Sequence, residues 1–116
     1  MTETICTGAC PAIKQGDACK LRVTLKLGDE AITAADLPLL HCVEFCLDGI
    51  RKLYPDAVTF ADGAFLVPLT QPETFALEPD TTIELDVRAH FLSGDVLGTK
   101  QRPKLAVVDA LSEVIL

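Results

Sequence analysis

The sequence contains no Trp and no Asn, and aromatic residues make up only 5% of its 116 residues. Without Asn there is no N-glycosylation sequon. Because Trp is absent and aromatic residues are few, a hydrophobic core must rest on Leu, Val, Ile and the five Phe residues. The chain also lacks a run of about 18 apolar residues, so we expect no transmembrane helix. The stretch from Met1 to Cys6 has no basic segment followed by an apolar one, so we expect no secretory signal and synthesis in the cytoplasm.

Basic residues are scarce as well. Ten Lys and Arg stand against seventeen Asp and Glu, which gives a net charge of -7. Nucleic acids and anionic membranes attract basic proteins, so we expect no nucleic-acid and no membrane partner. Two basic clusters exist, Arg51-Lys52 and the run from Lys100 to Lys104. We interpret both as solvated side chains rather than as binding sites.

The composition, 49% hydrophobic and 23% charged, is typical of a globular protein. The length suits one domain, and we assign residues 1–116 to it because no linker, repeat or low-complexity tract divides the chain. Residues 1–18 are polar and rich in turn-forming residues. We predict that they form an arm or an edge strand around Ile5.

Alternation of apolar and polar residues is the strongest pattern in the chain. From Ile83 to Phe91 every second residue is apolar, and charged residues or His fill the positions between. Successive side chains of a strand point to opposite faces, so this segment predicts a strand with one apolar and one charged face. Leu21 to Leu27 shows the same alternation. Shorter segments at 43–47, 50–54, 58–60, 64–69, 96–100 and 104–108 are also predicted as strands.

Turn and capping signals separate these segments. Asp48-Gly49 and Asp62-Gly63 are typical of tight hairpins, because a type I′ turn needs positive φ at both central residues. Thr33 followed by Asp36 predicts a capped helical turn that ends at Pro38, and Thr70 to Glu73 predicts a second. About seven strands and one or two single-turn helices favour an all-β fold, an immunoglobulin-like antiparallel β-sandwich. A small open barrel is the alternative.

Cysteine is the main candidate for chemistry. The odd count argues against a disulfide framework. Cys42 and Cys46 lie near His41, but in a strand residues four apart are about 13 Å from each other, too far to hold one zinc ion. A loop formed by Cys6 and Cys10, completed by Cys19 or His41, is a second way to build a zinc site. We expect neither, and interpret the cysteines as free thiols: Cys6, Cys10, Cys19, Cys42 and Cys46.

Enzymatic motifs are absent from the sequence. No phosphate-binding glycine loop and no His-Glu-x-x-His segment occurs. A hydrolase could pair one Cys with His41 or His90, but the sequence shows no base held within reach of a nucleophile. Asp48, Asp62 and Asp95 are scattered over turns and do not form a calcium loop. We therefore expect a non-enzyme and assign no catalytic, cofactor-binding or metal-binding residue.

Five short phrases stand out when they are read in chain order. They are Gln15-Gly16-Asp17, Ile32-Thr33-Ala34-Ala35-Asp36-Leu37, Gly49-Ile50-Arg51-Lys52, Leu69-Thr70-Gln71-Pro72-Glu73-Thr74-Phe75 and Leu85-Asp86-Val87-Arg88. Their order resembles that in small prophage-encoded proteins found near tail and baseplate genes, and the layout is similar to the N-terminal β-sandwich module of phage baseplate upper proteins. The resemblance covers residues 13–116 and leaves the first dozen residues unexplained.

This resemblance implies a structural or adaptor role in a virion, with other tail or baseplate proteins or a second copy of the chain as the partner. It brings no catalytic residues. Edge strands invite pairing with another chain, and apolar Val114-Ile115-Leu116 either docks on a partner or packs on its own core. Two other hypotheses remain open at this point: an immunoglobulin-like binding module for carbohydrate or protein, and a zinc- or thiol-dependent enzyme.

Overall fold

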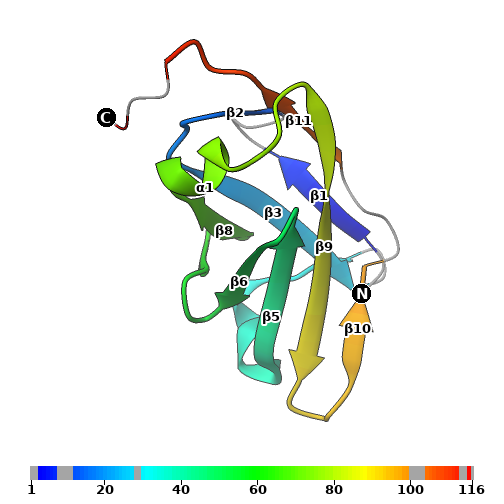
Figure 1. Ribbon diagram of the computed structural model, residues 1–116. Coiled ribbons are helices and arrows are strands. Elements are labelled where there is room, and N and C mark those ends of the chain that lie inside the picture. Colours follow the sequence, from blue (N-terminus) through cyan, green and yellow to red (C-terminus); the bar gives the residue numbers. More distant parts are fainter. Residues whose placement is uncertain (1–2, 8–11, 28–29, 100–103, 113–114, 116) are drawn as a thin grey trace.

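The computed structural model describes residues 3–7, 12–27, 30–99, 104–112 and 115, which form eleven strands and two short helices (Figure 1). The predicted all-β class is confirmed. Within these residues the strands outnumber the seven or so expected. Strands of two or three residues, such as β4 (Glu30–Ala31) and β7 (Thr59–Ala61), are too short to show alternation in a sequence.

The first sheet lies at the back in Figure 1 and is antiparallel in all its described pairings. Its order is β1-β3-β8-β7, with β4 also paired to β3. The longest member, β3, alternates as predicted, with Leu21, Val23 and Leu25 buried. The remaining bounds are β1 (Glu3–Thr7), β3 (Cys19–Leu27) and β8 (Ala64–Leu69).

The second sheet has the order β2-β11-β9-β5-β6, and β10 also pairs with β9. Its central strand is β9 (Thr81–Phe91), the segment with the strongest alternation. One pairing is parallel, between β2 and β11, which alternation alone could not have indicated. The other bounds are β2 (Ala12–Lys14), β5 (Leu40–Leu47), β6 (Ile50–Tyr54), β10 (Val96–Gly98) and β11 (Lys104–Val108).

A single apolar core lies between the two sheets. Phe45 of β5 and Phe65 of β8 meet across it, with ring centroids 5.5 Å apart. On β9 the alternation predicted from the sequence is confirmed, because Ile83, Leu85, Val87 and Ala89 are all buried. The rings of Phe45, Tyr54 and Phe65 therefore join the two sheets.

Both Asp-Gly hairpins form as predicted. Asp48 and Gly49 have φ of 43° and 84°, and they connect Leu47 of β5 to Ile50 of β6. Positive φ at both central residues is the type I′ geometry that matches the twist of a two-residue hairpin. Between β9 and β10, the N–H of Phe91 donates to the carbonyl of Asp95, which closes a longer hairpin.

The two predicted helical turns are also present. The α-helix α1 (Gln71–Phe75) begins at Thr70, whose N–H donates to Glu73 while its hydroxyl accepts from the Glu73 N–H. The 3₁₀-helix η1 (Ala34–Leu39) begins at Thr33, whose N–H donates to Asp36. Pro38 lies inside η1, so the prediction that it ends the turn was wrong. The turn ends after Leu39, where the chain enters β5.

Candidate functional site

The outer face of the second sheet carries most of the chemistry that the sequence offered. Because alternate residues of β5 and β9 fill the core, the residues between them point outward. On neighbouring strands these outward residues face each other in register, Glu44 opposite Arg88 and Cys46 opposite Asp86. The predicted polar face is therefore real, and the register decides which of its groups meet.

A β-bulge at the start of β5 changes the pattern. The register shifts between Leu40, which pairs with Phe91, and Cys42, which pairs with His90. The intervening residue, His41, is the extra residue of the bulge. Leu40 and Val43 are buried, whereas His41 is exposed and Cys42 is half-buried. A bulge re-aims side chains in this way, so that two consecutive residues lie outside the core.

This bulge brings together three possible metal ligands. One ligand atom from each of His41, Cys42 and His90 lies within 4.8 Å of the others. The imidazole rings of His41 and His90 are edge to face, with centroids 4.9 Å apart. All three residues were candidates in the sequence, but their spacing along the chain did not place them in one metal site. The available signal was the break in alternation at 40–43, where two polar residues separate two apolar ones.

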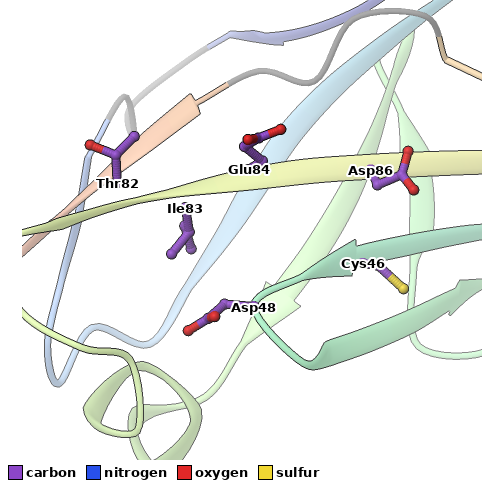
Figure 2. A pocket seen from close by; sticks show the side chains of 6 residues that line it. All are labelled: Cys46, Asp48, Thr82, Ile83, Glu84 and Asp86. Atoms are coloured by element: carbon purple, nitrogen blue, oxygen red, sulfur yellow. The ribbon is translucent and has the colours of Figure 1, made fainter.

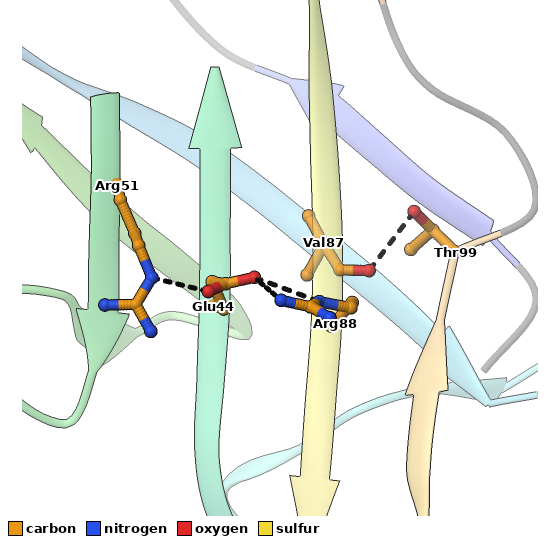
Figure 3. A network of polar contacts seen from close by, with 5 residues as sticks. All are labelled: Glu44, Arg51, Val87, Arg88 and Thr99. Atoms are coloured by element: carbon orange, nitrogen blue, oxygen red, sulfur yellow. Dashed lines mark hydrogen bonds and ion pairs between the residues drawn. The ribbon is translucent and has the colours of Figure 1, made fainter. Parts of the chain in front are cut away.

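A charged network crosses the same face on three strands (Figure 3). Arg88 of β9 donates from Nε and Nη2 to one oxygen of Glu44, at 3.0 and 2.6 Å. Arg51 of β6 donates to the other oxygen of Glu44. The hydrogen bond from Arg88, followed by that from Arg51, lowers the pKa of Glu44. Both oxygens of this carboxylate are thus engaged by guanidinium groups.

The charged network and two of the three possible metal ligands line one shallow hollow of about 220 Å³. Cys42 and His90 line it together with Glu44 and the two arginines. Two Arg charges and one Glu charge leave this rim with one net positive charge. Such a rim favours anionic groups near Cys42.

A second hollow, of about 430 Å³, lies further along β5 and β9 (Figure 2). It is acidic, with Asp48 at the β5–β6 turn and Glu84 and Asp86 on β9. The thiol of Cys46 also lines it, and burial raises the pKa of this thiol, with a further contribution from Glu44. A raised pKa keeps the thiol protonated and less nucleophilic, so Cys46 is poorly suited to covalent chemistry.

Four of the five cysteines lie within the described residues, at positions 6, 19, 42 and 46. Cys42 and Cys46 both lie in strand β5, so these two residues are too far apart along the strand to hold one zinc ion between them. Neither forms a disulfide. Cys19 begins β3 and packs against the core. Cys6 lies in β1 opposite Val23, whereas Cys10 is outside the described residues. The expectation that Cys6 and Cys10 are free thiols and hold no zinc therefore stays a prediction.

The basic pair Arg51-Lys52 contacts acidic side chains of the chain itself; Arg51 is exposed, as expected, whereas Lys52 is half-buried. Besides the contact of Arg51 with Glu44, Lys52 Nζ lies 2.9 Å from Glu73 in α1. Burial raises the pKa of Glu73, but the bonds from Lys52 and Thr70 outweigh it, and the pKa is lowered overall. Of the second basic cluster, only exposed Lys104 is described.

Apolar side chains are exposed at the end of the molecule where the β9–β10 hairpin lies, at the bottom of Figure 1. Leu92 is 66% exposed in the hairpin, and Val96 is 57% exposed on β10, opposite His90. Leu39, the last residue of η1, is 60% exposed, and its carbonyl accepts the N–H of Leu92 at 2.9 Å. We call Leu39, Leu92 and Val96 the hairpin-end patch.

Comparison with known proteins adds no assignment. No protein-family model and no curated protein sequence matches the chain. Neither short helix in the described part of the chain has the length and apolar character that crossing a membrane requires. Inference about function therefore rests on the geometry above and on the resemblance noted in the sequence.

Proposed function

We propose that this chain is a non-enzymatic, immunoglobulin-like β-sandwich module that acts through protein–protein contacts. The strand order supports the layout. Labelled A to G in the immunoglobulin manner, β1-β3-β8-β7 follows the order A-B-E-D, and β11-β9-β5-β6 follows G-F-C with an added C′ strand. The parallel pairing of β2 with β11 places a second N-terminal strand on the opposite sheet from β1.

The hairpin-end patch carries the proposal of a protein partner. Its three aliphatic side chains are each more than half exposed, and they lie at one end of the molecule. Among the described residues, the adjoining strand β10 is paired on one side only, with β9. An edge strand beside exposed apolar side chains offers both backbone hydrogen bonds and apolar contact to another polypeptide.

The biological setting of this contact rests on the sequence resemblance alone. That resemblance points to a tail or baseplate assembly of a phage, with another tail component or a second copy of this chain as the partner. A particle-bound adaptor needs no catalytic residue.

Native mass spectrometry of the full chain tests the proposal, alone and mixed with purified proteins encoded beside it. We expect a multimer or a complex that Leu92→Lys and Val96→Lys weaken. Val108→Lys is the matched control, because Val108 is 44% exposed on β11 at the far end of the sheet. A monomer that does not bind the tail proteins but binds glycans would favour the carbohydrate-binding alternative. Equal weakening by the Val108 control would contradict the assigned surface.

A further inference from the structure

We propose that His41, Cys42 and His90 form a binding site for a borderline-soft divalent metal ion, Zn²⁺, on the outer face of the second sheet. This inference is independent of the proposed adaptor function. It requires only that the bulge in β5 and its register with β9 are as described.

The distances fit such a site after small side-chain rotations. With Zn–N and Zn–S bonds of about 2.0–2.1 and 2.3 Å, neighbouring ligand atoms of a tetrahedron lie about 3.3–3.8 Å apart. Here the three ligand atoms already lie within 4.8 Å of one another. His41 is exposed and the other two residues are half-buried, so their side chains have room to converge.

The ligand types decide the class of ion. Imidazole and thiolate together select zinc and its neighbours in the transition series over Mg²⁺ and Ca²⁺, which prefer oxygen ligands. Three protein ligands leave a fourth tetrahedral position open, the arrangement typical of zinc sites that exchange a ligand. Glu44 does not fill that position, because Arg51 and Arg88 hold its two oxygens.

The charges around the site set its strength. Arg51 and Arg88 stand on the same hollow as Cys42 and oppose a bare cation. A thiolate and an anionic fourth ligand offset this repulsion. With three ligands instead of four, we expect a dissociation constant on the order of 1 µM, weaker than that of closed structural zinc sites.

Titration of the full, reduced chain with Zn²⁺ by calorimetry, and with Co²⁺ by absorption spectroscopy, tests the site. We expect one ion per chain and a thiolate-to-cobalt charge-transfer band that Zn²⁺ abolishes. Cys42→Ser should remove the band. His41→Ala and His90→Ala should each weaken binding by more than about 100-fold, since loss of an outer-sphere partner alone costs about 10- to 100-fold.

Two control variants separate this site from the other thiols. Cys46→Ser removes a half-buried thiol on the same face of β5, and Cys6→Ser with Cys10→Ser removes the alternative loop ligands. Both should bind as the unaltered chain does. The inference is overturned by absence of binding, by a band that persists in Cys42→Ser, by a band lost with Cys6 and Cys10, or by a His variant that binds normally. Circular dichroism checks folding, and His90→Gln and Cys42→Ala replace any variant that fails to fold.

Discussion

Val87→Asp is the sharpest test of the side-chain parity on which the fold depends. Val87 is fully buried in the middle of β9, and its neighbour Arg88 points to the outer face. The substitution places a carboxyl group between the two sheets. Arg88→Asp, one position along the same strand, places the same group at the surface and is the control.

The expected loss follows from two contributions. Removing the buried isopropyl group costs about 1.5–3 kcal/mol of unfolding free energy. Burying a polar group without a partner costs about 2–7 kcal/mol more, even if the carboxyl takes up a proton. The total, about 4–10 kcal/mol, is comparable with the net stability of a domain of this size, about 5–15 kcal/mol. We therefore expect Val87→Asp to unfold the protein or to leave it barely folded.

Urea denaturation and thermal melting, both followed by circular dichroism, measure the difference. Val87→Asp should show no cooperative transition, or a Tm lowered by more than about 15 °C. Arg88→Asp should keep a cooperative transition with a small loss, because it gives up the ion pair with Glu44 without entering the core. Comparable melts for the two variants would refute the assignment of inward and outward positions on β9.

Three further outcomes are expected from single changes elsewhere. Because the pKa of Glu44 is lowered in the fold, its ionised form stabilises the fold above the unfolded-state pKa of about 4.3, and this stabilisation is lost as pH falls through the lower folded-state pKa. The melting temperature of Glu44→Gln should therefore depend less on pH below about 5 than that of the unaltered chain. An equal pH dependence of the two would argue against the network. Thr74→Val should lower the free energy of unfolding, measured by urea denaturation, by about 1–3 kcal/mol, because the buried hydroxyl accepts from the N–H of Gly16 and donates to the carbonyl of Asp17. Thr74→Ser keeps the hydroxyl and should recover most of this loss. Gly49→Ala should lower the free energy of unfolding by about 1 kcal/mol because of the φ of 84° alone, since an added Cβ meets no atom within 4 Å. An unchanged free energy of unfolding would exclude the type I′ turn.

Much of the architecture could be predicted from local pattern. A strand has a side-chain period of two, so the buried and exposed residues of β3 and β9 were predictable without knowing what they pack against. Asp-Gly pairs and the two capping boxes are likewise local, because their geometry depends on a few adjacent residues. Pro38 was misjudged because η1 extends one residue beyond it, to Leu39, whereas the expected turn ended at this proline. The parallel pairing of β2 with β11 joins segments about ninety residues apart, and no local pattern encodes it.

The residues of the candidate metal site were visible in the sequence, but their combination was not. Alternation placed His90 on the outer face of its strand, and Cys42 and His41 stood next to each other in the chain. Only the register between β5 and β9 brought His90 opposite Cys42, and only the bulge turned His41 to the same side. Side-chain direction within a strand follows from local stereochemistry, whereas register and bulges follow from how two distant strands hydrogen-bond and fill one core.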